Sequence, residues 1–265
     1  MRRCIELASK NVGYTYPNPL VGSVIVCDNK VIGEGSHAKY GESHAEVNAI
    51  NSVKDKRLLK NSTLYVNLEP CNHYGKTPPC TEAIINNNIK KVVIGSQDPN
   101  KLVNGTGIKK LRSSGCDVSV GILEKECDEL NKRFFTYHKL KRPFIILKWA
   151  ESKDGFISPI KSFNTLKKVN WISGEDAKKL SHKWRSEEHS ILVGVQTIID
   201  DDPILTTRFV EGRSPIRFVL DPDSRIPLDS RILSGTVKTI VLSKKENKLI
   251  PVSYTHLRAH ETLSY

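Results

Sequence analysis

Strand-like and helix-like segments alternate through the first 140 residues, and this alternation constrains the fold more than any other feature of the chain. The stretch SVIVCDNKVIGEG has two apolar runs around Asp28–Asn29–Lys30, which predicts two strands joined by a tight turn. The runs STLYVNLEP, KKVVIGS and CDVSVGI then alternate with helix-like runs of roughly ten residues. This order predicts an α/β layered fold with a largely parallel sheet, closed by one long helix over EKECDELNKRFFTYHKLKR.

A second α/β unit is predicted to begin near Arg142–Pro143. The segment PFIILKWA has the continuous apolar pattern of a buried strand. The segment NWISGEDAKKLSHKWRSEE predicts a helix with Ser173 near its N-terminal cap, and HSILVGV, PIRFVLD and KTIVLS predict further strands. We therefore expect a first domain over residues 1–141, a second over 142–250, and a separate tail over 251–265.

Composition narrows the class of protein. No run approaches the roughly eighteen apolar residues of a membrane-spanning helix, and the basic start lacks the apolar run and cleavage site of a signal peptide. We expect a cytoplasmic protein, in which six cysteines indicate metal or core roles before disulfides. The net charge of +12 divides evenly, as 20 − 14 = +6 in residues 1–140 and 21 − 15 = +6 in residues 141–265. Such a basic chain suits either a nucleic acid or phosphorylated small molecules.

Three candidate metal ligands follow two predicted strands. His44 and Glu46 form a His-x-Glu triplet after one strand, Cys71 follows a proline after the next, and Cys80 opens a helix. Each piece alone is ambiguous, since the triplet could simply start a helix and the cysteines could be inert buried thiols. Together, one imidazole and two thiols would give zinc three protein ligands and leave a fourth position for water, as in catalytic sites. The helix N-terminus predicts that Cys80 ionises easily, and Glu46 is the spare carboxylate that would move protons.

The order H-x-E followed by Pro-Cys resembles the cytidine-deaminase superfamily, although eight residues separate the two cysteines where most members have two. With TYPNPLVGSVIV, HAEVNAI, LEPCNHYGKTPPC and QDPN, the chain resembles the bifunctional deaminase–reductases of riboflavin biosynthesis. This resemblance implies a cytidine-deaminase-like three-layer α/β/α domain, then an incomplete α/β domain similar to dihydrofolate reductase. It also implies Zn²⁺ and NADPH as cofactors. The implied reactions are hydrolytic deamination of 2,5-diamino-6-(5-phosphoribosylamino)pyrimidin-4(3H)-one and NADPH-dependent reduction of the product's ribose.

The same resemblance implies residue roles in both domains. In the deaminase, Glu46 is catalytic, His44, Cys71 and Cys80 bind zinc, and the substrate residues are Asn18, His37, His73, Lys76, Asp98 and Asn100. In the reductase, the substrate residues are Lys148, Arg185, Leu205 and Arg208, and the cofactor residues are Glu151, Trp171, Thr197 and Asp201. The ordinary alternative for the substrate and cofactor residues is a turn, cap, core or surface role. The remaining cysteines, Cys4, Cys27, Cys116 and Cys127, are expected to be small core residues.

The chain also departs from the family pattern. Glu151 stands where an alanine is expected, Val169 stands where a serine is expected, and the segment before Trp171 is longer and more basic than expected. The tail PVSYTHLRAHETLSY matches nothing expected, so we predict a truncated reading frame with a non-native end and an impaired reductase. The expected partner is a phosphorylated pyrimidine, with no membrane or nucleic acid, in a homo-oligomer. Two alternatives stay open: a transfer-RNA base deaminase, and a non-enzymatic protein with a structural zinc ion.

Overall fold

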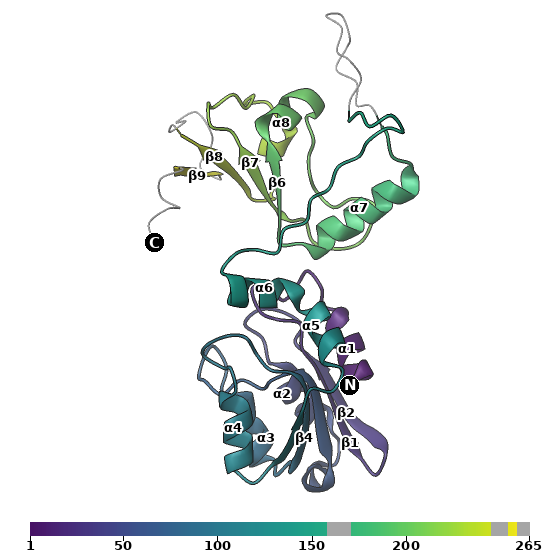
Figure 1. The fold of residues 1–265 in the computed structure, drawn as a ribbon, viewed down its shortest axis with the longest axis vertical. Helices are drawn as coiled ribbons and strands as arrows, with labels where there is room; N and C mark the ends of the chain where they lie inside the picture. The colour runs from purple at the N-terminus through teal and green to yellow at the C-terminus, as the bar shows by residue number, and fades with distance from the viewer. Residues whose placement is uncertain (158–170, 245–253, 259–265) are drawn as a thin grey trace, which may run out of the picture. The chain divides into compact units, whose positions relative to one another are not determined.

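The computed structural model describes residues 1–157, 171–244 and 254–258. The basic segment with Val169 and the last residues of the tail lie outside this description. Contacts divide the chain into two compact units, Met1–Ile146 and Leu147–Tyr265 (Figure 1). No helix of the described residues is long and apolar enough to cross a membrane.

A five-stranded sheet forms the centre of the first unit, in the order β2-β1-β3-β4-β5. Its strands are β1 (Gly22–Cys27), β2 (Lys30–Ser36), β3 (Thr63–Leu68), β4 (Lys91–Ser96) and β5 (Asp117–Val120). Strands β3, β4 and β5 are parallel, whereas β1 is antiparallel to both β2 and β3. The expected hairpin is present, and Asp28 and Asn29 at its turn have φ values of 49° and 58°. Positive φ at both central residues matches the twist of a two-residue hairpin.

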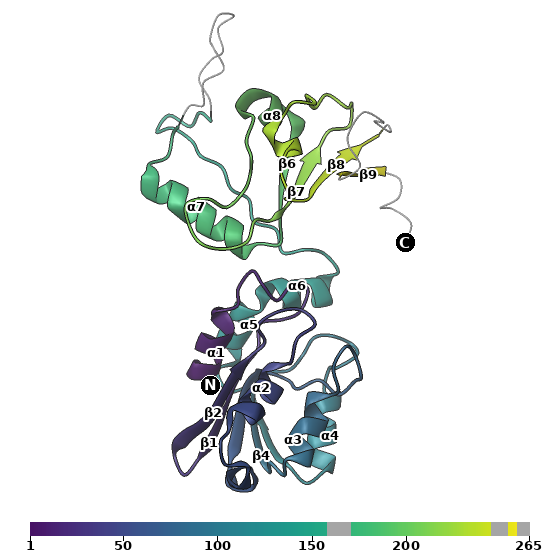
Figure 2. The same cartoon turned by 180° about the vertical axis from the view of Figure 1, so that it is seen from behind.

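Helices cover both faces of this sheet. Helices α1 (Arg2–Ser9) and α5 (Glu124–Leu130) pack on one face. Helices α2 (Ala45–Ser52), α3 (Cys80–Asn86) and α4 (Thr106–Ser113) pack on the other, as Figures 1 and 2 show from opposite sides. A 3-10 helix, η1 (Lys56–Asn61), leads into β3. The main core lies between the sheet and the second set of helices and includes Leu64, Val66, Ile84, Ile94 and Leu111. The predicted three-layer α/β/α fold is confirmed.

The predicted single closing helix is wrong, because the chain forms two helices, α5 and α6 (Lys132–Leu140). They are separated at Asn131, whose backbone leaves the helical conformation at φ −102° and ψ 18°. The Asn131 side chain is buried, where its Oδ1 accepts the Leu20 N–H at 2.8 Å and its Nδ2 donates to the Leu20 carbonyl at 2.9 Å. These tertiary hydrogen bonds stabilise the break, and helical periodicity does not reveal them.

The second unit contains a parallel sheet in the order β6-β7-β8-β9. Its elements are α7 (Glu175–Glu187), β6 (Ser190–Gly194), α8 (Val195–Asp201), β7 (Ile216–Leu220), η2 (Arg231–Leu233), β8 (Thr239–Ser243) and β9 (Tyr254–Arg258). Ser173 precedes Gly174, which caps α7. Val195, Ile198, Val219, Ile232 and Val241 form a separate core. Strand β9 belongs to the segment predicted to be non-native, and the origin of that segment stays a prediction.

The prediction of a buried strand over PFIILKWA is wrong. Residues 143–150 have no regular secondary structure, and Ile145, Leu147 and Trp149 are 62%, 78% and 65% exposed. An apolar run becomes a strand only where a neighbouring strand supplies backbone hydrogen bonds. Within the described residues, neither sheet includes this segment.

Candidate active site

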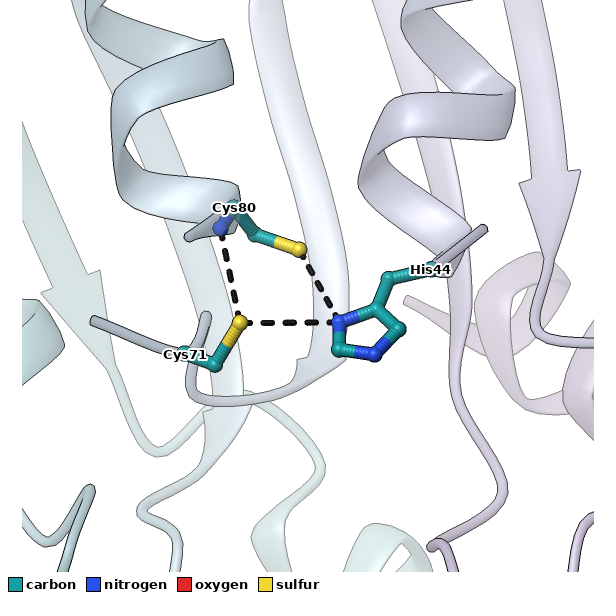
Figure 3. A group of neighbouring side chains, drawn as sticks. All are labelled: His44, Cys71 and Cys80. Atoms are coloured by element: carbon teal, nitrogen blue, oxygen red, sulfur yellow. Dashed lines mark hydrogen bonds between the residues drawn. The ribbon is translucent and has the colours of Figure 1, made fainter. Parts of the chain in front are cut away.

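Three side chains from separate parts of the first unit meet at the carboxyl end of β3. His44 is the N-cap of α2, Cys71 follows β3, and Cys80 is the first residue of α3. His44 Nδ1 lies 3.3 Å from Cys80 Sγ and 3.5 Å from Cys71 Sγ, and the Cys80 N–H donates to Cys71 Sγ at 3.4 Å (Figure 3). All three possible ligand atoms lie within 4.8 Å of one another.

Close packing of α2 on β2 holds the histidine in place. A Cβ atom on Gly35 of β2 would lie only 2.3 Å from the backbone nitrogen of Ala49 in α2. Any side chain at residue 35 would therefore push the helix away from the sheet. Because His44 and Glu46 lie at the start of the same helix, this contact fixes both residues relative to the strands.

The cluster fits a zinc ion. Typical zinc–sulfur and zinc–nitrogen bonds at tetrahedral angles place a thiolate sulfur and an imidazole nitrogen about 3.5 Å apart. The two sulfur–nitrogen distances here are 3.3 Å and 3.5 Å. One histidine and two cysteines also match the composition of open, catalytic zinc sites, which keep one position for water or substrate.

In the metal-free cluster the negative charge lies on Cys71, whereas the helix N-terminus alone predicts it on Cys80. The pKa of Cys71 is lowered to about 4, first by its hydrogen bond with the Cys80 thiol and then by His44. The pKa of Cys80 is raised, first by that same hydrogen bond and then by burial and by Glu46. The prediction that Cys80 ionises easily is therefore wrong for the metal-free site, because a thiolate already lies beside it. Zinc binding requires both thiols to lose their protons.

Glu46 has the surroundings of a proton carrier. The residue is 3% exposed, and its pKa is raised to about 7 by burial first and by the charge of Cys71 second. A carboxyl group that titrates near neutral pH can both accept and release a proton during a reaction. Glu46 also lines the cavity beside the cysteine–histidine cluster.

A cavity of about 360 Å³ opens on this cluster. Its lining includes His44, Glu46 and Cys71. It also includes all six residues expected to contact the deaminase substrate, namely Asn18, His37, His73, Lys76, Asp98 and Asn100. Residues from four separate loops thus share one cavity, and their roles in binding stay predictions.

Asn18 and His37 form a defined pair in the cavity wall. His37 Nδ1 lies 3.2 Å from the Ser43 carbonyl, and His37 Nε2 lies 3.0 Å from Asn18 Nδ2. A carbonyl can only accept a hydrogen bond, so Nδ1 carries the proton and Nε2 accepts from the amide. Burial lowers the pKa of His37, in agreement with this neutral form.

The segment between the two cysteines contributes His73 and Lys76. The His73 Nδ1 atom is buried and has no hydrogen-bond partner in the described part of the chain, which leaves it available to a bound molecule. Lys76 Nζ lies 4.1 Å from the centre of the Tyr40 ring, a cation–π distance.

Asp98 and Asn100 also make the turn contacts that their residue types favour. Asp98 Oδ1 accepts the Asn100 N–H at 2.7 Å, and Asn100 Oδ1 accepts the Leu102 N–H at 3.2 Å. Burial, then Glu69 and Cys71, raise the pKa of Asp98 to about 7, whereas the Asn100 N–H opposes this shift. Asp98 and Asn100 therefore both stabilise a turn and line the cavity.

Sequence reasoning missed several cavity residues, including Glu69, Tyr40, Val103 and Phe134. Glu69 stands inside the LEPC motif, so its position offered a signal. Phe134 lies on α6, whose path depends on the break at Asn131. Nothing in the local pattern around Phe134 distinguishes it from a core aromatic residue.

In the second unit, two of the predicted reductase residues, Arg185 and Arg208, lie beside His182. Arg185 Nη1 donates to the Thr206 carbonyl at 2.8 Å, and the Arg208 N–H donates to His182 Nδ1 at 3.0 Å. Burial and the charge of Arg208 lower the pKa of Arg185, whose buried Nε atom has no hydrogen-bond partner among the described residues. Leu205 is part of the second unit's core.

The other reductase candidates are spread over the second unit. Lys148 and Glu151 are exposed in the segment without regular structure, where Glu151 accepts a hydrogen bond from Trp149. Trp171 is exposed, with Lys178 Nζ 3.9 Å from its ring centre. Thr197 and Asp201 lie on α8. Within the described residues, hydrogen bonds bring Arg185 and Arg208 to His182, and the roles of all the reductase candidates stay predictions.

Two family models match the chain. The cytidine and deoxycytidylate deaminase zinc-binding region matches residues 1–96, and the RibD C-terminal domain matches residues 143–261. The chain is 46% identical over 250 residues to riboflavin biosynthesis protein RibD of Aquifex aeolicus, covering 94% of this chain and 68% of the relative. It is 41% identical over 264 residues to RibD of Synechocystis sp., covering 99% of this chain and 70% of the relative. The chain thus spans about two thirds of the length of these proteins.

Solved structures give the same relationship. A diaminohydroxyphosphoribosylaminopyrimidine deaminase/5-amino-6-(5-phosphoribosylamino)uracil reductase from Thermotoga maritima superposes with a TM-score of 0.88 at 40% identity. That match covers 97% of this chain and 72% of the other. Acinetobacter baumannii RibD superposes with a TM-score of 0.87 at 36% identity, with the same coverage. Both units of the chain therefore have the fold expected from the sequence.

Proposed function

Because this chain belongs to the RibD family of riboflavin biosynthesis proteins, we propose that its first unit deaminates the diaminopyrimidine ribosyl phosphate expected from the sequence. The observation that carries the proposal is the placement of Glu46. A buried carboxyl group with a pKa of about 7 lines the same cavity as a His44–Cys71–Cys80 cluster that fits zinc. A structural zinc site would use a fourth protein ligand in place of an open position beside such a carboxyl group.

His44, Cys71 and Cys80 would hold the zinc ion. When bound, zinc supplies Lewis acidity, which makes water nucleophilic near neutral pH. In the overall reaction a C–O bond forms at the ring carbon that bears the amino group, the C–N bond breaks, and ammonia leaves. Glu46 transfers the two protons of water in turn, the first to the ring nitrogen and the second to the departing amine.

The remaining cavity residues would bind and orient the substrate. His73, whose Nδ1 has no partner within the described residues, and the neutral Asn18–His37 pair offer hydrogen bonds to the pyrimidine. Lys76, held over Tyr40, offers a positive charge to the phosphate. Asp98 and Asn100 offer further polar atoms in the lining of the same cavity.

For the second unit, we propose the reduction of the deaminated product's ribose. The RibD C-terminal domain fits NADPH, which when bound would supply the hydride. Arg185 and Arg208 would bind the substrate phosphate, since both are cationic and the buried Nε of Arg185 has no partner among the residues that the structure describes. The proposal extends to an oligomeric enzyme of the cytoplasm that acts on small phosphorylated pyrimidines.

Product mass after incubation with the diaminopyrimidine phosphate, zinc and NADPH tests both reactions. Deamination adds about one dalton, and reduction of the ribose adds about two more. We expect the one-dalton gain, with the further two daltons weak or absent if the reductase is impaired. An unchanged substrate mass, together with salt-sensitive deamination of transfer RNA, would favour the nucleic-acid alternative.

A further inference from the structure

Glu69 makes an unusual set of contacts for a residue with no assigned role. The residue is 4% exposed, and its two carboxylate oxygens accept four backbone hydrogen bonds. Oε2 accepts the N–H groups of Asp98 at 3.2 Å and Gly105 at 2.9 Å. Oε1 accepts those of Gly107 at 3.0 Å and Ile108 at 3.2 Å. All four donors lie in residues 98–108, the segment that runs from the end of β4 into α4.

A carboxylate is the side chain best suited to these donors. Three of the four N–H groups belong to the start of α4, where backbone donors have no partner within the helix and the helix dipole is positive. The ionised carboxylate offers about four acceptor positions and no donor. An amide in its place would direct an NH₂ group at backbone donors on one side, so it could not replace this set of hydrogen bonds.

A second contact joins the same two segments. A Cβ atom on Gly107 would lie 2.1 Å from the Pro70 carbonyl oxygen, so the first turn of α4 touches the backbone between Glu69 and Cys71. The Glu69 N–H also donates to the carbonyl of Ser96, the last residue of β4, at 2.9 Å. Glu69 is thus hydrogen-bonded through its main chain to β4 and through its side chain to the 98–108 segment.

The consequence concerns the cavity. The 98–108 segment carries Asp98 and Asn100 in the cavity wall, and Cys71 lies two residues after Glu69. The distance between this part of the wall and the metal ligands therefore depends on the Glu69 carboxylate. A shift of the segment by about one ångström is enough to weaken the alignment of substrate with a catalytic group.

We propose that Glu69 is a positioning residue that sets the substrate affinity of the deaminase site by holding the Asp98–Asn100 turn at a fixed distance from the metal ligands. The proposal rests on the proposed deaminase function. Glu69 acts through the 98–108 segment. Its two carboxylate oxygens are occupied by four backbone N–H groups, so they bind the protein backbone rather than the substrate.

The test compares Glu69→Gln with Glu34→Gln, a matched isosteric change at an exposed ion pair with Arg3. For E69Q we expect KM for the diaminopyrimidine phosphate to rise about ten-fold, kcat to change by less than about three-fold, and zinc content to stay at that of the parent chain. Amide hydrogen exchange in residues 98–108 should be faster in E69Q than in the parent chain. E34Q should change neither KM nor exchange in this segment.

Gly107→Ala gives an independent variant if E69Q folds poorly. Its new methyl group would lie 2.1 Å from the Pro70 carbonyl oxygen and 3.2 Å from Glu69 Oε1, so it would push α4 away from both while residue 69 stays a glutamate. We therefore expect the same rise in KM and the same faster exchange. Parent-like KM in both variants, with lower thermal stability alone, would mean that Glu69 is merely a structural helix cap. Loss of zinc from folded E69Q would also overturn the proposal, because Glu69 would then act through Cys71.

The exchange measurement separates this inference from the proposed function. If the parent chain itself does not deaminate the substrate, the deaminase proposal fails. Amide hydrogen exchange still tests the contact between Glu69 and residues 98–108. Unchanged protection of residues 98–108 in E69Q would then refute the positioning role. Faster exchange confined to that segment would support it.

Discussion

Two glutamates on the cavity wall illustrate how surroundings decide the role of one residue type. Glu46 is buried beside the cysteine thiols, and burial raises its pKa to about 7. Glu69 accepts four backbone N–H groups and is occupied by the protein itself. The first carboxyl group is suited to exchange protons, and the second is suited to hold backbone in place.

Replacing Glu46 with glutamine tests the first role. The amide keeps the size of the side chain but cannot accept and return a proton, so we expect kcat for deamination to fall by about 10²- to 10⁴-fold. Zinc content, measured by elemental analysis, should equal that of the parent chain, because His44, Cys71 and Cys80 are unchanged. Undiminished turnover in a zinc-loaded E46Q protein would contradict the proposed proton transfer.

At the scale of elements, short polar contacts decide where helices and loops end. Asn131 separates α5 from α6 by bonding the Leu20 backbone, and Asn67 donates to the same Leu20 carbonyl at 2.9 Å. These two buried asparagines fix the segment that leads from Asn18 into β1. The direction of α6, and with it the position of Phe134, depends on this junction.

Asn131→Ala should therefore destabilise the first unit. Removing the amide leaves the buried Leu20 N–H without its acceptor, which costs about 1–3 kcal/mol in the free energy of unfolding. Urea denaturation followed by far-UV circular dichroism measures this loss. Asn86→Ala, at an exposed position on α3, is the matched control and should change stability by less than about 0.5 kcal/mol. Equal stability of the two variants would show that the junction does not depend on Asn131.

His182 makes the second unit sensitive to acid. Its side chain is buried, and burial, Arg185 and Arg208 lower its pKa from 6.5 to about 4. The unfolded chain therefore takes up this proton before the folded chain does. The contribution of neutral His182 to the free energy of unfolding is fully present above about pH 6.5. It is lost as pH falls toward 4, by up to about 3 kcal/mol.

Denaturation at pH 7.5 and pH 5 tests this effect through tryptophan fluorescence, since Trp184 lies on the same helix as His182. In His182→Asn the amide oxygen can still accept the Arg208 N–H, but the side chain no longer titrates. We expect the parent chain to lose more stability than H182N between the two pH values. The same loss in both proteins would assign the acid sensitivity to other groups.

At the scale of the whole molecule, each unit has its own hydrophobic core. The predicted metal ligands belong to the first unit, and all three tryptophans, Trp149, Trp171 and Trp184, belong to the second. Tryptophan fluorescence therefore reports on the second unit, whereas circular dichroism reports on both. This division allows the two units to be followed separately in one experiment.

Removing zinc should destabilise the first unit selectively. A ligand present at about a thousand-fold excess over its Kd stabilises the folded state by about 4 kcal/mol. Addition of a chelator should therefore shift the urea transition seen by circular dichroism and leave the fluorescence midpoint unchanged. An equal shift of both signals would show that the two units unfold together, and no shift would contradict zinc binding by the first unit.

The sequence alone determined the elements whose signals are local. Apolar periodicity located strands β1 to β8 and most of the α-helices, but not α8, β9 or the two 3-10 helices. The His-x-Glu and Pro-Cys motifs located the residues that meet as a candidate zinc site. Tertiary structure decided what depends on distant partners. The break at Asn131 needs the Leu20 backbone, and residues 143–150 form no strand because no neighbouring strand pairs with them in the described chain. The low pKa of Cys71 and the four donors to Glu69 likewise arise from atoms far apart in sequence. Periodicity reports which face of an element is apolar, but hydrogen-bond partners and buried charges are settled only when the chain folds.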